Sequence, residues 1–472
     1  MEEIMKKVVF VFIIVFCISY PVRTQEIHTF AGQGDLEKVK MLLEQDPSLL
    51  DHIYVLGTPA LWAARYGQIN VLDYLIKMGA DMNKKTSDIT PLFHAAFMGE
   101  QKTVEFLLSR GAEIGFFEAV ECGFKGLAIK MISEGEDIHQ FKSSGYLPLY
   151  RAARYGHKEI IDYFIENGLE RDVKDNSGQN LIHSAAFGGQ YELVKHLVNL
   201  GVDMNAQTKL GDTPLDFAVD NGDPRIIEYL KEKGAVSGRK IEYTIDEITD
   251  SIYKISFPGR PDSNAGIFLF SDGALLIDTG GGNRAAEALN SIVKERNNAE
   301  VKYIINTHND WDHKRGNTFY QERSVIINAL NLDKMAKKGI LTAKDSLIKS
   351  NYESTLSRYY MMKLGGEDIV IFPIPGTHTP SDMFIYFRNE DVVFTGDAIT
   401  SGILQRDGEN EDKYVERIKR RVDYFGAYHN EILRILIKMC SSSTICVPGH
   451  GGSFEISHVK EYLNIAKEAI NR

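Results

Sequence analysis

The chain has 472 residues and a formal net charge of −11, from 54 Lys and Arg against 65 Asp and Glu. Hydrophobic residues make up 43% and charged residues 25%, an ordinary globular composition that excludes a disordered, collagen-like or multi-span membrane protein. Residues 241–472 carry 28 basic and 32 acidic groups and the first 240 residues carry 26 and 33, so neither half has the basic excess that favours nucleic acid, and we expect no nucleic-acid partner.

Residues 1–25 have the pattern of a signal peptide. Lys6 and Lys7 precede an apolar run from Val8 to Tyr20, which is short for a membrane span and fits the core of an export signal. No small-x-small cleavage triplet follows the run, so an uncleaved N-terminal anchor is the alternative. We predict an exported protein, periplasmic or secreted, that meets a membrane only if this segment is retained.

One motif recurs through residues 26–238. Its clearest copies are Thr58–Gly67, Thr90–Gly99 and Thr213–Gly222, each with Thr-Pro at the start and Gly at the end. Thr caps a helix, Pro fits the first turn, and Gly adopts the left-handed conformation that ends it. Seven glycines close successive copies at spacings of 33, 32, 24, 33, 33 and 33 residues: Gly34, Gly67, Gly99, Gly123, Gly156, Gly189 and Gly222.

This pattern resembles the ankyrin repeat family. The resemblance implies an all-α solenoid of about seven repeats over residues 26–238, with one repeat shortened near 111–123, where we expect a kink or a missing β-turn finger. It also implies a concave face that binds a protein partner. Aromatic and arginine side chains flank several first helices, either as anchors for that partner or as packing within the stack: Trp62, Arg65, Tyr66, Arg151, Arg154 and Tyr155.

A small-residue linker at 234–240 precedes a second region, residues 241–472. Strands are predicted at 252–257 and 301–306, a hairpin at 263–270 and 274–280, and a helix at 284–297. We expect helices over or near the functional site within 329–363.

Metal-binding side chains follow four of the predicted strands. Residues 307–313, Thr-His-Asn-Asp-Trp-Asp-His, come directly after the strand at 301–306, and one further His or Asp follows each of three later strands. Four His and three Asp suit two metal ions with room for a water molecule. The seven residues are His308, Asp310, Asp312, His313, His378, Asp397 and His450.

The order of these motifs, from Asn264-Ala-Gly and Leu276-Ile-Asp-Thr-Gly to Pro-Gly-His450, resembles the metallo-β-lactamase-fold superfamily over residues 241–472. The resemblance implies an α/β domain of the αββα sandwich type, with a dinuclear metal site at one edge between the sheets. The first metal would be held by His308, Asp310 and His378, the second by Asp312, His313 and His450, and Asp397 would bridge them.

The resemblance also implies that the catalytic residue is Asp312, which would orient the nucleophile. Asp278 would support a ligand loop by hydrogen bonding, with a plain structural turn as the alternative. Lys314, Arg315 and residues 401–410 adjoin the ligand motifs in sequence and are either groups near the ligands or the substrate or solvated surface residues.

Asp310 departs from the common His-x-His-x-Asp-His motif, because it stands where the second His is usual. The site then contains three carboxylates, and harder oxygen ligands weaken the preference for zinc. Two divalent ions are therefore expected, with Zn²⁺ favoured and Mn or Fe as alternatives.

The predicted function is metal-dependent hydrolysis of a small molecule by an activated hydroxide, which would open an ester, lactone, amide or related bond, with the repeats as a protein-binding module. One alternative is a non-catalytic ankyrin interaction protein with a relic metal domain. A diiron redox protein is a further, less favoured alternative, since no flavin domain or cysteine cluster is recognisable in this chain.

Overall fold

A computed structural model describes residues 26–53, 57–86, 89–137, 148–238, 240–258, 263–321, 323–345, 358–374, 378–379, 381–399, 413 and 432–470. Residues 1–25, 401–410 and 414–421 lie outside this description. Within it, no helix combines the length and the apolar character needed to cross a membrane.

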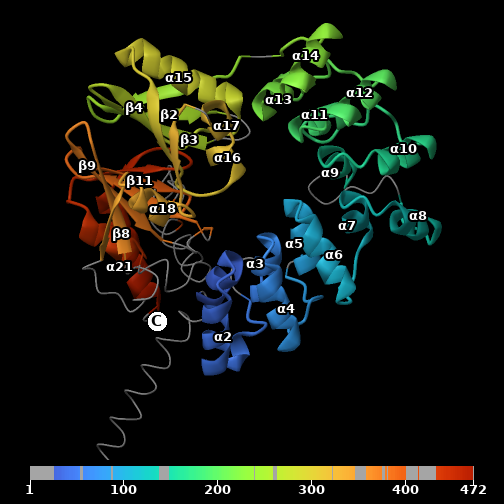
Figure 1. The fold of residues 1–472 in the computed structure, drawn as a ribbon, viewed down its shortest axis with the longest axis horizontal. Coiled ribbons are helices and arrows are strands. Elements are labelled where there is room, and N and C mark those ends of the chain that lie inside the picture. Colours follow the sequence, from blue (N-terminus) through green and yellow to red (C-terminus); the bar gives the residue numbers. More distant parts are fainter. Residues whose placement is uncertain are drawn as a thin grey trace, which may run out of the picture.

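The N-terminal half is a curved stack of helix pairs (Figure 1). After a helical segment at 26–33, the inner helices of the curve are α3 (Pro59–Arg65), α5 (Pro91–Met98), α7 (Phe116–Glu121), α9 (Pro148–Arg154), α11 (Leu181–Phe187) and α13 (Pro214–Asn221). The outer helices are α2 (Leu36–Gln45), α4 (Ile69–Lys77), α6 (Gln101–Ser109), α8 (Lys125–Ser133), α10 (Lys158–Glu166), α12 (Tyr191–Asn199) and α14 (Pro224–Glu232), and η1 (Pro47–Leu49) follows α2.

The repeat motif forms these pairs as its chemistry predicts. The hydroxyl of Thr58 accepts a hydrogen bond from the amide of Leu61 at 3.2 Å, which caps α3. Gly99 ends α5 with a φ of +78°, a conformation that L side chains rarely adopt. Small alanines are fully buried between neighbouring inner helices, for example Ala63 and Ala95, so the helices can stack closely.

The segment that leads into the fourth repeat is shorter than the corresponding segments of the later repeats. Residues 110–115 alone connect α6 to α7, whereas residues 167–180 connect α10 to α11 and residues 200–213 connect α12 to α13. The missing residues are those of the finger between repeats, which explains the short glycine interval.

The second half is built on two sheets (Figure 1). The first has the strand order β1-β2-β3-β4-β5-β6, with β1 (Thr244–Glu247), β2 (Ile252–Phe257), β3 (Ser263–Phe270), β4 (Gly273–Ile277), β5 (Val301–Ile305) and β6 (Val325–Ile327). The second has the order β13-β12-β11-β10-β9-β8-β7, with β7 (Thr342–Asp345), β8 (Arg358–Leu364), β9 (Glu367–Pro373), β10 (Met383–Phe387), β11 (Val392–Gly396), β12 (Ile445–Pro448) and β13 (Phe454–Glu455).

The two sheets pack face to face and helices cover their outer faces. Apolar side chains of both sheets, such as Phe268 and Phe387, interlock in one buried cluster. The outer face of the first sheet is covered by α15 (Asn283–Asn297). A helical segment at 432–439 and α21 (Ile456–Ile470) cover the second sheet. The predicted fold class, an all-α solenoid followed by an αββα sandwich, is confirmed.

Within 329–363, where helices were expected, residues 346–357 lie outside the description. A short helix, α18 (Leu332–Lys337), is followed by β7 and β8, which extend the second sheet. In β8, Tyr360 and Met362 are buried and their neighbours are more exposed. This period of two is a strand pattern, so the second sheet extends into the range where helices were expected.

The last repeat contacts the sandwich directly. Arg284, in the first turn of α15, donates to both carboxylate oxygens of Asp220 on α13 and lies 3.0 Å from Asp212. Gly282 permits this approach, because a Cβ there would lie 2.6 Å from the Cβ of Asp220.

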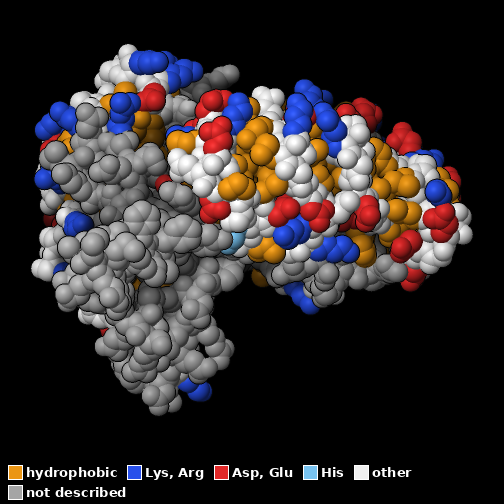
Figure 2. All heavy atoms as spheres, turned by 90° about the horizontal axis from the view of Figure 1, so that it is seen from below, with side chains coloured by type: hydrophobic (Ala, Val, Ile, Leu, Met, Phe, Trp, Pro, Cys, Tyr) orange, Lys and Arg blue, Asp and Glu red, His pale blue; other side chains and the backbone are white. Residues whose placement is uncertain are grey.

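On the face shown in Figure 2, acidic and basic side chains are mixed along the repeats.

Candidate metal centre

The seven predicted ligands lie beyond the ends of strands at one edge of the sandwich. His308 and Asp310 follow β5 of the first sheet, and Asp312 and His313 are on α16 (Trp311–Lys314), which begins directly afterwards. His378 follows β9, Asp397 follows β11 and His450 follows β12, three strands that run in the same direction in the second sheet. The carboxyl ends of these strands therefore bring the seven side chains together.

One group consists of His308, Asp310 and His378. The Nε2 atom of His308 is 3.9 Å from Oδ2 of Asp310, and Nε2 of His378 is 4.0 Å from the same oxygen. Their ligand atoms all lie within 4.8 Å of one another, which is the spacing of atoms that share one metal ion.

The second group consists of Asp312, His313 and His450. Oδ2 of Asp312 is 3.7 Å from Nε2 of His313 and 3.4 Å from Nε2 of His450. The two histidine nitrogens are 3.5 Å apart. These atoms also converge within 4.8 Å.

Asp397 stands between the two groups. Its Oδ2 is 3.8 Å from Nε2 of His308 and 3.2 Å from Nε2 of His450, while its Oδ1 is 3.4 Å from Nε2 of His313. The carboxylate therefore faces both candidate positions, as a bridging ligand would.

The residues fit divalent metal ions on chemical grounds. His308 Nε2 and Asp397 Oδ1 are buried and form no hydrogen bond within the described part of the chain. Burial without a partner is unfavourable for such atoms, and a bound cation would remove the penalty. The structure also leaves no room for a side chain here, because a Cβ at Gly449 would lie 2.1 Å from Oδ1 of Asp397.

Asp278 holds the ligand loop from behind. It follows β4 with a φ of +61°, and its Oδ1 accepts from the amide of Thr307 at 2.8 Å. Its Oδ2 accepts from the Thr307 hydroxyl at 2.7 Å and lies 2.8 Å from Nδ1 of His313. That contact turns Nε2 of His313 toward the centre, which is how carboxylates orient histidine ligands.

Two supporting residues were not assigned by the sequence. Asp382 accepts from the amides of His378 and Thr379 and so shapes the His378 loop. Asn264 donates to the carbonyls of Pro448 and Gly451, both at 2.9 Å, and so fixes the loop that carries His450. The Asn264-Ala-Gly motif was visible in the sequence, but only the fold shows what it touches.

The charges of the cluster are strongly coupled. Burial, followed by the nearby His313, lowers the pKa of His308 to about 4, so this ring is neutral and ready to bind a cation. Burial opposes a charge on His450, but Asp312 and Asp397 outweigh it and raise its pKa to about 10. Burial likewise opposes ionisation of Asp397, yet His313 and His450 hold its pKa well below the usual range.

Arg315 and Trp311 connect the loop of the predicted ligands to the repeats. Lys314, the last residue of α16, is exposed. The guanidinium of Arg315 lies 3.6 Å from the ring centroid of Phe187 on α11 and donates to the Phe187 carbonyl. The ring of Trp311, between two predicted ligands, meets Phe187 edge-to-face at 5.6 Å.

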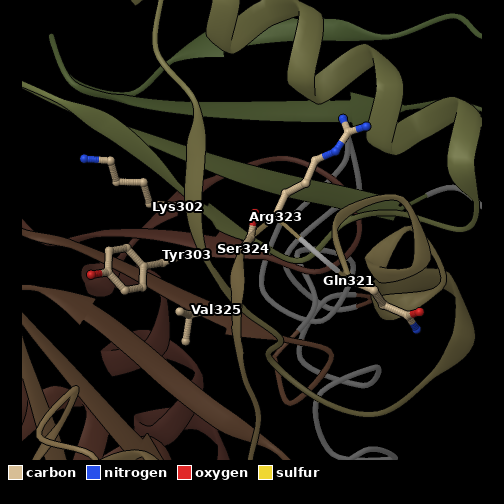
Figure 3. A pocket seen from close by; sticks show the side chains of 6 residues that line it. All are labelled: Lys302, Tyr303, Gln321, Arg323, Ser324 and Val325. Carbon is tan, nitrogen blue, oxygen red and sulfur yellow. The ribbon is translucent and has the colours of Figure 1, made fainter.

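A surface pocket at the edge of the first sheet is a separate feature (Figure 3). It lies near the beginnings of β5 and β6, whereas the predicted ligands lie beyond the end of β5. It is therefore not part of the metal centre. Its lining residues are Lys302, Tyr303, Gln321, Arg323, Ser324 and Val325.

Comparison with known proteins identifies both halves. The family model described as "Metallo-beta-lactamase superfamily" matches residues 258–439, and that described as "Ankyrin repeats (3 copies)" matches residues 27–118, 116–208 and 149–241. The chain thus combines two known classes of domain. Its N-terminal half is an array of ankyrin repeats, and residues 258–439 belong to the metallo-beta-lactamase superfamily.

Individual relatives match one half each. A hydroxyacylglutathione hydrolase of Pelagibacter ubique (strain HTCC1062) is 34% identical over 111 residues, 23% of this chain and 40% of the relative. An ankyrin repeat and KH domain-containing protein of Caenorhabditis briggsae is 28% identical over 124 residues, 25% of this chain and 5% of the relative. The serine/threonine-protein kinase VIK of Arabidopsis thaliana is 38% identical over 91 residues, 19% of this chain and 21% of the relative. The chain therefore spans less than half the length of each of these relatives.

Proposed function

We propose that the chain is a metal-dependent hydrolase whose two divalent ions are bound by the seven clustered His and Asp side chains. The observation that carries this proposal is the convergence of those side chains into two groups that share Asp397. His308, Asp310 and His378 would hold the first ion, and Asp312, His313 and His450 the second. Membership of the superfamily and the similarity to a hydroxyacylglutathione hydrolase support hydrolysis as the reaction class.

The ions, when bound, would lower the pKa of a water molecule toward neutrality and polarise the bond under attack. The chain's own contribution is positioning. Asp312 is ionised at neutral pH, because His450 and His313 outweigh the effect of burial and lower its pKa. A carboxylate held in this way can accept a hydrogen bond from the attacking water and fix its direction.

The substrate class proposed is a small molecule with an ester, lactone, amide or related bond. Zn²⁺ is the favoured metal, with Mn or Fe as alternatives, because Asp310 adds a third carboxylate to the ligand set. Export also remains our prediction and rests on residues 1–25, which lie outside the described part of the chain.

We also propose that the repeats bind a protein partner. Two of the side chains expected to anchor that partner, Trp62 and Arg151, are buried in the structure. Trp62 and Arg151 are only 4% and 8% exposed, and Arg151 stacks on Phe97 at 3.6 Å and donates to its carbonyl. Packing is therefore the better interpretation of Arg151, and Trp62 is too deeply buried to anchor a protein partner. A partner would meet other parts of the array.

The test is hydrolysis by the metal-loaded protein against a panel of esters, thioesters, lactones, amides and β-lactams. Asp312→Asn keeps the size of the side chain and removes its charge, so kcat should fall by about 100-fold or more on whichever substrate is cleaved. Asp333→Asn, on the exposed surface of α18, is the matched control and should leave kcat within about twofold. Equal rates for the metal-loaded protein, its Asp312→Asn variant and buffer alone would reject the hydrolase proposal in favour of a relic domain.

A further inference from the structure

The inner face of the second and third repeats contains buried hydrogen-bonding groups without partners. Trp62 is 4% exposed and its Nε1 has no acceptor, and His94 is 6% exposed with both ring nitrogens unpaired. The Nε of Arg65 and the hydroxyl of Tyr66 are also buried and unpaired; these statements cover the part of the chain that the structure describes. Native proteins rarely bury such groups unpaired, and most of the exceptions have a functional reason.

These four side chains form one patch. Trp62, Arg65 and Tyr66 are three and four residues apart, so they share one face at the end of α3. The Trp62 and Tyr66 rings are 6.3 Å apart, and the Arg65 guanidinium lies 5.6 Å from the Tyr66 ring centroid. His94 occupies in α5 the position of Trp62 in α3, four residues after the capping threonine.

The patch is directed toward the metal centre. Figure 1 shows α3 and α5 on the inner side of the curved array, toward the sandwich. Burial is the main reason for the raised pKa of Tyr66, and the charges of Asp310 and Asp382 add to it. Asp310 is a predicted ligand of the first metal position, and Asp382 shapes the loop of His378, another predicted ligand of that position.

Cationic side chains lie on both sides of this space, where the charges of Asp310 and Asp382 also act. Arg65 on the array, Lys314 at the end of α16 and Arg315 directly after it form no ion pair with any residue of the described chain. Each of the four side chains can donate a hydrogen bond, His94 through one of its two ring nitrogens, because burial lowers its pKa to about 4 and keeps the ring neutral. Donors and unpaired cations together select an anionic acceptor.

We propose that the patch formed by Trp62, Arg65, Tyr66 and His94 is a substrate subsite that binds a carboxylate group, while the bond to be cleaved lies at the metal centre. This inference deepens the proposed hydrolase function and rests on it. The ankyrin array then acts within its own chain as the second wall of the active site.

The chain offers a direct reporter of this subsite. It has two tryptophans, and Trp62 is in the patch while Trp311 is in the ligand helix. Trp311→Phe leaves Trp62 as the single tryptophan, so its emission, excited where tyrosine does not absorb, can be followed while benzoate is added, with benzamide as the neutral match. We expect saturable binding of benzoate and at least tenfold weaker binding of benzamide.

Arg65→Gln, made in the Trp311→Phe background, should weaken benzoate about tenfold, because a hydrogen bond to a charged group is lost. Arg225→Gln, on the exposed surface of outer helix α14, is the control and should not change the affinity. Far-UV circular dichroism of each variant checks that the array is folded. Binding that is unchanged by Arg65→Gln, or equal for benzoate and benzamide, would overturn the subsite.

Metal-free protein separates the subsite from the metal centre. Carboxylates also bind metal ions directly. Benzoate binding that is lost on chelation and is unchanged by Arg65→Gln would therefore be binding to the metal ions, and this result would reject the proposal. Binding that persists without metal and depends on Arg65 supports it. Because this titration needs no turnover, the subsite can be judged separately from the hydrolase activity.

Discussion

Asp278 links three parts of the metal centre through one carboxylate. It receives the amide and the hydroxyl of Thr307, which begins the ligand loop, and it contacts the ring of His313. The residue is 2% exposed, so water cannot replace these contacts. Loss of its charge should affect the loop and the second metal position together.

Asp278→Asn is therefore expected to weaken metal binding by about 10- to 100-fold, the usual effect of removing a partner of a ligand. Isothermal titration with Zn²⁺ measures the affinity. Asp272→Asn is the matched control, since Asp272 is an exposed carboxylate paired with Lys302. Identical affinity in Asp278→Asn and the parent protein would show that Asp278 has no part in metal binding.

The proton balance of the metal-free centre gives a second prediction at this scale. Because Asp312 and Asp397 raise the pKa of His450 to about 10 despite its burial, the ring is protonated at pH 7 without metal. A histidine ligand must be neutral, so metal loading should release protons, and metal affinity should rise with pH up to about 10.

Titration calorimetry at pH 7 in buffers of different ionisation enthalpy counts the released protons. We expect about one or more per chain on loading with two ions. Full metal binding with no proton release would contradict the assigned role of His450.

At the scale of elements, one arginine joins α15 of the sandwich to α13 of the repeats. Arg284 lies 2.6 Å from Asp220, 3.0 Å from Asp212 and 3.6 Å from Asp216, and its side chain is 16% exposed. Burial disfavours its charge, but these three carboxylates raise its pKa further above the usual range.

Arg284→Met should destabilise the folded chain by about 3–5 kcal/mol, because it leaves partly buried carboxylates without their cation. Urea unfolding followed by circular dichroism measures this loss. Arg296→Met on the same helix, where the ion pair with Glu247 is long at 3.9 Å and more exposed, should cost no more than about 1 kcal/mol. Equal stability of the two variants would show that the Arg284 cluster does not hold these elements together.

The same scale explains which features the sequence could predict. The predicted ligands each follow a strand, and strand ends are encoded locally by short apolar runs followed by turn residues. The repeats were readable because Thr-Pro caps and closing glycines recur at one period. The strands at 342–345 and 358–364 were missed, since they fall in a long segment in which only helices were expected.

The contacts between the halves could not be predicted in this way. These contacts join residues more than sixty positions apart in the sequence, as for Arg315 with Phe187 and Arg284 with Asp220. A periodic pattern within one element does not predict which residues of another element it will contact. The sequence contained one indication of this contact. Asp216 and Asp220 are four residues apart and share one side of the last inner helix, and Asp212 lies just before that helix begins. A cation facing them could have been expected, but not its identity.

At the scale of the molecule, the repeats and the sandwich lie together at the metal centre. Phe187 of α11 contacts Trp311, the first residue of α16, and Arg315, directly after α16, and Arg284 connects α13 to α15. The array is therefore structurally connected to the site and is more than an appended binding module. Metal binding should therefore also stabilise the helices of the repeats.

Metal removal should accordingly lower the melting temperature of the whole chain, since an ion that binds only the folded state stabilises it by mass action. Circular dichroism at 222 nm follows the repeats, which supply much of the helix. In Arg284→Met the shift of the helical transition on chelation should be smaller than in Arg296→Met. If the melting temperature of the helical transition in the parent chain is the same with and without metal, the two halves unfold independently.

The most direct test of the account is the metal content of the protein. The chain should be purified without added metal, analysed by mass spectrometry, and then titrated with Zn, Mn and Fe, with Asp310→Ala in parallel. We predict about two ions per chain at saturation and a lower content in Asp310→Ala, since that carboxylate faces His308 and His378. No bound metal after purification, together with no uptake of any of the three ions, would contradict the dinuclear centre and the hydrolase function built on it.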